Sequence, residues 1–184
     1  RHFEQAGEAD KAVDYLVEAA GYAWQRNGLV EAYELYGRAS ELLPEASADD
    51  APDLRGRRIA IELGRLKAGF TFLPEEQQMA LVPWLVEEAD RIDDLRLAAD
   101  VHLHVALLLS FGGARHDSSP ALRHSLDRIR EIAEQLDDPL IDALPNSLIG
   151  LFEVFSGQLR QGVERLREVA PLLARKRDFI GSSF

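Results

Sequence analysis

The chain has 184 residues, a length that predicts one domain or one compact array of repeats. Apolar residues make up 46% and charged residues 29%, which argues against a disordered chain, and the absence of cysteine excludes disulfides and thiolate metal sites. Its 21 lysines and arginines against 32 aspartates and glutamates give a net charge of -11, so nucleic acid and anionic membranes are not expected partners.

Apolar residues recur every three or four positions along most of the chain, which is the spacing of helices that bury one face. Leu29, Tyr36 and Leu43 show it well, because they share a face that Glu31 and Glu34 avoid. We predict helices over residues 10–26, 29–43, 52–72, 75–91, 95–110, 119–136, 139–156 and 159–175, with longer loops near 44–51 and 112–118. The short links make successive helices antiparallel neighbours.

Helix start and stop signals agree with these bounds. Asn27 and Gly28 fit a left-handed cap at the end of the first predicted helix. Asp94 and Asp138 fit N-caps, and Pro139 fits the first position of a helix. Capping residues therefore support the predicted helix boundaries at several places.

Two features compete with regular helices. Residues 101–105 alternate like a strand, but their helical surroundings and the length of the apolar run favour a buried helix. Pro83, Pro145 and Pro171 fall inside predicted helices, where a proline costs about 3 kcal/mol. We expect kinks or restarted helices at these prolines.

Packing positions recur at fixed offsets, which is typical of stacked helical hairpins. The residues predicted to pack the repeats are Ala12, Leu16, Ala19, Ala20, Ala32, Tyr36, Ala39, Pro44, Ala89, Ile92, Ala133, Leu136, Ala170 and Leu173. Alanines let two helices approach closely, and a large residue nearby fills the remaining gap. We predict an all-α fold of about eight helices, in which about four antiparallel hairpins stack as one superhelical array over residues 1–184.

One stretch resembles a known repeat family. Leu16, Ala20, Ala32, Tyr36, Ala39 and Pro44 match the tetratricopeptide (TPR) consensus, whereas Ala23 replaces its usual tyrosine. Residues 1–44 also resemble the repeats that follow the nucleotide-binding domain of bacterial STAND-type ATPase regulators, such as LuxR-type transcription activators and multidomain adenylate or guanylate cyclases. The resemblance implies a TPR-like superhelix that senses a partner or inducer. We expect the chain to be a fragment whose ATPase, cyclase or DNA-binding parts lie elsewhere.

The pattern predicts no catalytic, cofactor-binding or metal-binding residues. His102 and His104 are two positions apart and lie on different faces of a helix, unlike the pair four apart in a helical zinc site. His116 is predicted to lie in a loop. Paired aspartates sit at helix junctions, where they are expected to cap helices: Asp49-Asp50, Asp93-Asp94 and Asp137-Asp138.

The aromatic and basic residues are expected to have structural roles. Trp84, the tyrosines and the phenylalanines occur at helical spacing, which favours core packing over a ligand groove. Arg55, Arg57 and Arg58 form the densest basic cluster. We expect them to neutralise nearby carboxylates on a solvated helix face, with binding of an acidic partner as the alternative.

These observations predict a non-catalytic protein-protein interaction or regulatory scaffold domain in the cytoplasm, with no nucleic acid or membrane contact. The expected partner is a peptide, a protein, another domain of the parent chain or a second copy in a homo-oligomer. The alternative is a domain that senses a small-molecule inducer in a groove of the helical array. A helical enzyme is a third interpretation, which needs convergent titratable groups in a pocket.

Overall fold

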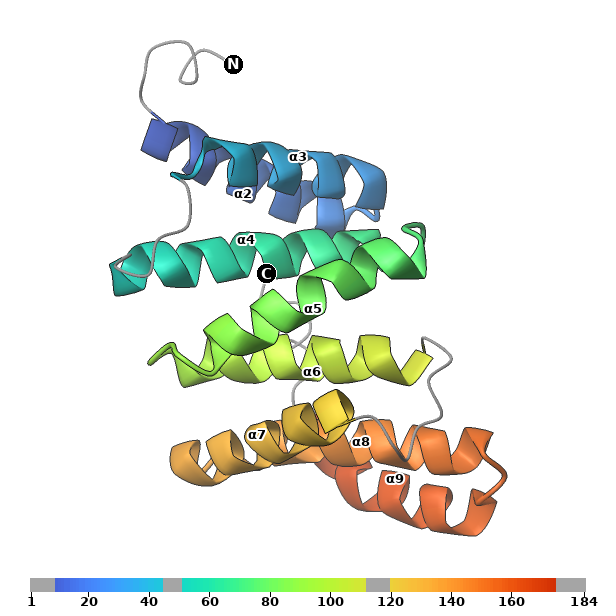
Figure 1. The fold of residues 1–184 in the computed structure, drawn as a ribbon. Coiled ribbons are helices and arrows are strands. Elements are labelled where there is room, and N and C mark those ends of the chain that lie inside the picture. The colour runs from blue at the N-terminus through green and yellow to red at the C-terminus, as the bar shows by residue number, and fades with distance from the viewer. Residues whose placement is uncertain (1–8, 45–50, 112–119, 175–184) are drawn as a thin grey trace. The chain divides into compact units, whose positions relative to one another are not determined.

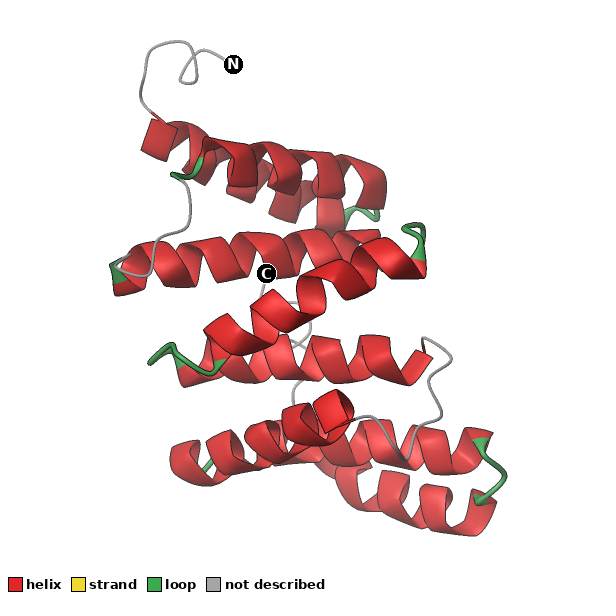
Figure 2. Ribbon diagram, viewed as in Figure 1, coloured by secondary structure: helices red, strands yellow, loops and turns green. Residues whose placement is uncertain are grey.

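The computed structural model describes residues 9–44, 51–111 and 120–174, and every regular element among them is a helix (Figures 1 and 2). The helices are α2 (Ala9–Gln25), α3 (Leu29–Leu42), α4 (Pro52–Gly69), α5 (Glu75–Ala89), α6 (Leu95–Phe111), α7 (Pro120–Leu136), α8 (Pro139–Phe155) and α9 (Leu159–Ala174). Each end lies within three residues of its predicted position. The all-α prediction is confirmed, and the alternating residues 101–105 lie inside α6.

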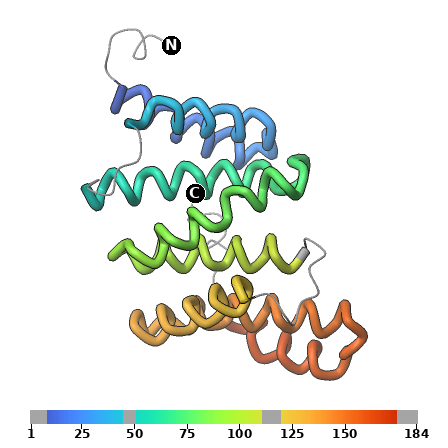
Figure 3. The backbone as a smooth tube through the Cα atoms, in the orientation of Figure 1, coloured from blue at the N-terminus to red at the C-terminus, as the bar shows by residue number. Residues whose placement is uncertain are grey.

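The chain divides into two compact units, Arg1–Leu97 and Ala98–Phe184. In the first unit α2 packs on α3, α3 on α4, and α4 on α5, and in the second α7 packs on α8 and α8 on α9. Figures 1 and 3 show these neighbours running antiparallel within each unit. The prediction of sequential antiparallel helices is confirmed, whereas one superhelical array over the whole chain stays a prediction.

Three of the short links between helices share one backbone conformation. Asn27, Asp137 and Gly157 each have a positive φ, of 59°, 48° and 89°. The amide that follows each of them bonds to a carbonyl five residues back, at Gly28 N to Ala23 O (2.8 Å), Asp138 N to Ala133 O (3.1 Å) and Gln158 N to Glu153 O (2.7 Å). This Schellman arrangement satisfies helix-end carbonyls and turns the chain sharply. It confirms the left-handed cap predicted at Asn27 and Gly28, with Asn27 as the left-handed residue.

Aspartates begin two of the helices as predicted. Asp94 accepts hydrogen bonds from two backbone amides of α6, at 3.0 and 3.1 Å. Asp138 accepts one from the Leu140 amide at 3.0 Å, and Pro139 occupies the first turn of α8. Both carboxylates therefore act as caps, which is the structural role expected of them. The pair Asp49-Asp50 lies outside the described residues.

The end of α4 differs most from prediction, because residues 70–72 form a turn and not a further helical turn. The Gly69 carbonyl accepts hydrogen bonds from the amides of Phe72 (3.1 Å) and Leu73 (2.9 Å). A β-carbon on Gly69 would lie 2.3 Å from the Leu73 side chain, so glycine is what lets this turn close. The buried Gln78 donates to the carbonyls of Phe70 and Leu73 at 3.2 and 2.7 Å.

The three internal prolines do not end their helices. Pro83, Pro145 and Pro171 lie inside α5, α8 and α9, each of which is continuous. The expected restarts are therefore absent at these positions. Each helix tolerates the loss of one amide hydrogen bond because its other turns hold the chain helical and its apolar face packs against a neighbour.

Tyr36 organises the contact between α3 and α4. Its side chain is 9% exposed, and it lies against Gly64, where a β-carbon would come within 2.6 Å of the ring. The ring thus packs directly on the α4 backbone. Around it the core of the first unit contains Val13, Leu16, Ala20, Ala23, Ala32, Ala39, Leu43, Ile61 and Ala68.

The predicted packing residues differ in their burial. The buried ones are Ala12, Leu16, Ala20, Ala32, Tyr36, Ala39, Ala89 and Ala133, the intermediate ones are Ala19, Ile92, Leu136 and Leu173, and the exposed ones are Pro44 and Ala170. Pro44 still serves structure, because its carbonyl accepts a hydrogen bond from Arg58 at 2.6 Å. The predicted loops near 44–51 and 112–118 fall almost entirely outside the described residues.

Candidate functional site

A groove of about 640 Å³ runs along α2 and ends at the turn into α3. Its lining residues are Tyr15, Glu18, Ala19, Tyr22, Ala23, Arg26, Gly28 and Glu31. All of them come from α2, the turn and the first residues of α3. The groove therefore belongs wholly to the first unit.

The spacing of the lining residues explains why they share one side of α2. Tyr15, Ala19, Tyr22 and Arg26 follow one another at steps of four, three and four, which repeats the helical period. The adjoining face of α2 is buried in the core described above. Because that face already packs the core, the tyrosine-bearing side is left toward solvent, and the side chains of Tyr15 and Tyr22 are 63% and 65% exposed.

The far end of the groove is shaped by the turn between α2 and α3. Gly28 is the N-cap residue of α3, and its amide donates to the Ala23 carbonyl at 2.8 Å. A β-carbon on Gly28 would lie 3.1 Å from that carbonyl and 3.5 Å from the Glu31 carboxylate. Glycine therefore keeps this end of the groove open and lets the carboxylate lie over the turn.

The polar groups of the groove have no partner within the described part of the chain. Tyr15, Glu18, Tyr22, Arg26 and Glu31 form no hydrogen bond or ion pair there through their side chains. Such groups remain able to bind a ligand without first breaking an internal contact.

The basic cluster predicted on α4 is engaged inside the first unit. Arg57 binds the carboxylate of Asp14 and the backbone carbonyl of Asp10, the latter at 3.0 Å. Arg55 pairs with Glu88 of α5 at 3.3 Å. These pairs confirm that the cluster neutralises nearby carboxylates. They also tie α4 to α2 and α5.

Aromatic residues divide between core and surface. Tyr33 packs edge-on against Phe72, with ring centroids 5.6 Å apart, and the Arg65 guanidinium lies 4.9 Å from the Tyr33 ring centroid. Trp84 is half-buried. The core assignment holds for Tyr36 and is wrong for Tyr15 and Tyr22, which line the groove. One sequence signal could have indicated this exposure. Both tyrosines lie beside the apolar stripe of their helix and not within it.

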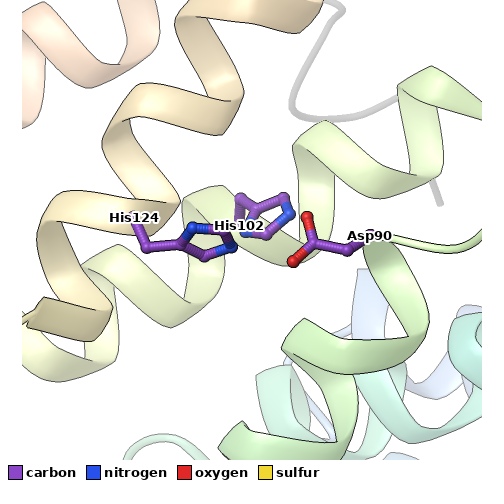
Figure 4. Close-up of side chains that lie close together, drawn as sticks. All are labelled: Asp90, His102 and His124. Atoms are coloured by element: carbon purple, nitrogen blue, oxygen red, sulfur yellow. The ribbon is translucent and has the colours of Figure 1, made fainter.

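Two histidines of the second unit meet in a way that the sequence did not reveal. The His102 and His124 rings have centroids 5.6 Å apart and an interplanar angle of 74° (Figure 4). His102 is fully buried, and its Nδ1 lies 3.4 Å from Ser125 Oγ. Asp90, drawn in the same view, belongs to the first unit.

An apolar surface lies on the last hairpin, where Leu151 and Phe155 of α8 and Leu159 and Val163 of α9 are exposed by 39–73%. Each pair is four positions apart, so each pair follows one side of its helix. The neighbouring Arg160 is already engaged, because it bonds to Glu164 at 3.2 Å. The groove on α2 therefore offers the more specific chemistry.

Comparisons with family models, curated proteins and solved structures find no match to this chain. The TPR resemblance therefore stays a prediction, and the function has to be argued from the groove itself. Within the described residues, no helix combines the length and the apolar content needed to cross a bilayer.

Proposed function

We propose that this chain is a non-catalytic helical module that binds a peptide or protein partner along the groove of α2. The observation that carries the proposal is the groove's lining, in which two exposed tyrosines and three charged side chains have no partner among the described residues. Tyrosine supplies a large contact area at low entropic cost and is enriched at protein interfaces.

The regulatory context is a further part of the proposal. The resemblance of residues 1–44 to repeats of bacterial STAND-type regulators supports a scaffold or sensing arm in a signalling or transcription regulator. The partner would then be a separate protein or another domain of the parent chain.

A peptide library displayed on phage and selected on the immobilised chain tests this function. Ala19→Gln fills the groove floor without adding charge, so selected peptides should bind it about tenfold more weakly than the original chain. Ala170→Gln makes the same change at an exposed alanine of α9 and should leave their affinity unchanged. The proposal fails if no peptide is selected, or if all selected peptides bind the three proteins equally.

A small-molecule inducer is the second candidate, and the groove's volume favours it, since about 640 Å³ lies within the range of small-molecule sites. A thermal-shift screen on the same three proteins separates the two functions. A metabolite at about 100 times its dissociation constant should stabilise the chain by about 2.7 kcal/mol. That stabilisation should be lost in Ala19→Gln and retained in Ala170→Gln.

A further inference from the structure

Two tyrosines and one alanine form a recess within the groove. Tyr15 and Tyr22 are seven positions apart, which places them about 10.5 Å apart along the helix axis. Ala19 lies between them and extends only to its β-carbon. The recess therefore has an aromatic wall at each end and a shallow floor, and both walls are mostly exposed.

Glu18 adds a carboxylate to the rim of this recess. It follows Tyr15 by three positions and precedes Tyr22 by four, so it is a surface neighbour of both tyrosines. Aromatic faces attract cations through their quadrupole, and a carboxylate attracts them by charge. A cationic group entering between the tyrosines would meet both attractions together.

The opposite charge occurs farther along the groove. Arg26 lies eight positions after Glu18, about 12 Å along the helix axis. Over the whole lining, the carboxylates of Glu18 and Glu31 and the guanidinium of Arg26 sum to a formal charge of -1. An anion would be repelled by Glu18 at the recess and attracted by Arg26 near the turn.

We propose that the recess of Tyr15, Glu18, Ala19 and Tyr22 binds an arginine or lysine side chain of a peptide partner, while Arg26 binds a carboxylate about 12 Å farther along the same peptide. This inference rests on the proposed function and names the chemistry of its partner. The phosphates of a nucleic acid would be repelled by the Glu18 carboxylate at the recess. A free amino acid is too short to reach both sites.

The recess is tested with two capped tripeptides, acetyl-Ala-Arg-Ala-amide and its glutamate twin, acetyl-Ala-Glu-Ala-amide. NMR titration follows the Ala19 methyl signal and the ring signals of Tyr15 and Tyr22. The arginine peptide should shift all three saturably, and the glutamate peptide should not. Equal shifts with both peptides would overturn the inference.

Matched variants show which side chains contribute to the affinity for the arginine peptide. Glu18→Gln should raise the dissociation constant of the arginine peptide about threefold, because one carboxylate of the recess is lost. Glu41→Gln removes the same charge from an exposed position of α3 and should leave the constant unchanged. Tyr22→Leu should weaken binding, whereas Tyr22→Phe keeps the aromatic face and should not. Equal effects of the two glutamate variants would show general charge attraction and refute the recess.

The second contact is tested with a longer alanine-based peptide that carries arginine and glutamate two helical turns apart. Arg26→Gln should raise the dissociation constant of this peptide about threefold and leave that of the arginine tripeptide unchanged. The two proposals fail differently. Phage-selected peptides that depend on Ala19 but carry no excess of cationic residues would refute the recess and retain the proposed function. Selection of no peptide that depends on Ala19 would refute both.

Discussion

At the scale of single residues, Glu153 of α8 and Arg165 of α9 form an ion pair with two hydrogen bonds between the helices of the last hairpin. Two guanidinium nitrogens of Arg165 donate to the two carboxylate oxygens of Glu153, at 3.0 and 2.8 Å. These hydrogen bonds lower the pKa of Glu153, although partial burial opposes the shift. They also raise the pKa of Arg165. The pair therefore links protonation of one carboxyl to the stability of the last hairpin.

The sign of that linkage gives a prediction for Glu153→Gln. Because the folded-state pKa of Glu153 is depressed, the pair stabilises the fold above the unfolded pKa of about 4.5, and this stabilisation disappears as pH falls through the folded pKa. The variant should be about 1 kcal/mol less stable near neutral pH and equal to the original chain in strong acid. Urea unfolding across this pH range measures the difference.

A matched substitution separates this pair from ordinary surface pairs. Glu164→Gln breaks the contact with Arg160, whose side chain is 93% exposed, and should change the free energy of unfolding very little at any pH. A difference between Glu153→Gln and the original chain that persists in strong acid would contradict the linkage, because the carboxyl is then protonated in both states.

Residue-scale contacts are also where sequence reasoning was weakest. Spacing along one helix showed that His102 and His104 diverge, but it could not show that His124 reaches His102 from α7. Likewise, the repeat pattern grouped Ala19 with buried Ala39, although Ala19 lines the groove. Periodicity identifies positions on one helix, whereas burial depends on which neighbouring helix covers them.

At the scale of elements, α8 and α9 approach each other through glycine. A β-carbon on Gly162 would lie 2.6 Å from the Gly150 carbonyl oxygen and 2.8 Å from the Val154 amide nitrogen. Both are backbone atoms, so relief would require one helix to move away from the other. This close approach allows the Glu153–Arg165 contact to form beside it.

We predict that Gly162→Ala destabilises the protein by about 1–3 kcal/mol, because the added methyl overpacks the crossing. Gly56→Ala is the control, since a β-carbon there would meet nothing within 4 Å. It should stabilise the protein by about 0.5–1 kcal/mol through the better helix propensity of alanine. Chemical unfolding followed by circular dichroism measures both. A stability gain in Gly162→Ala would show that the crossing is looser than described.

The elements themselves were largely predictable, because three kinds of local signal agreed. Apolar spacing gave the helices, Asp94 and Asp138 marked starts, and Asn27 marked a reversal. The signal failed at residues 70–72, where apolar residues continued the helical spacing beyond Gly69. The turn there depends on Leu73 folding over that glycine, a contact that periodicity does not contain.

At the scale of the whole molecule, the main helix packing described within each unit joins helices that are neighbours in sequence, and the contacts of Arg57 with Asp10 and Asp14 add a link from α4 to α2. If the helices stack as the predicted repeat array, the stability of the chain is a sum of local terms between adjacent elements. The sequential packing also explains why the fold class followed from the sequence while the function did not. Local periodicity specifies sequential helices, but it carries no information on the role of exposed side chains such as Tyr15 and Tyr22, which lie outside the predicted repeat-packing positions.

This nearest-neighbour organisation predicts that a substitution at one helix contact destabilises only the helices that form that contact. Tyr36→Ala removes the ring that covers Gly64 and should cost about 3 kcal/mol at the contact of α3 with α4. Amide hydrogen exchange in those two helices should accelerate about a hundredfold, because each 1.4 kcal/mol corresponds to a factor of ten. Exchange in α8 and α9 should stay unchanged in the same sample, which serves as an internal control. Equal acceleration in all four helices would show instead that the chain unfolds as one cooperative body, and the additive account would then be wrong.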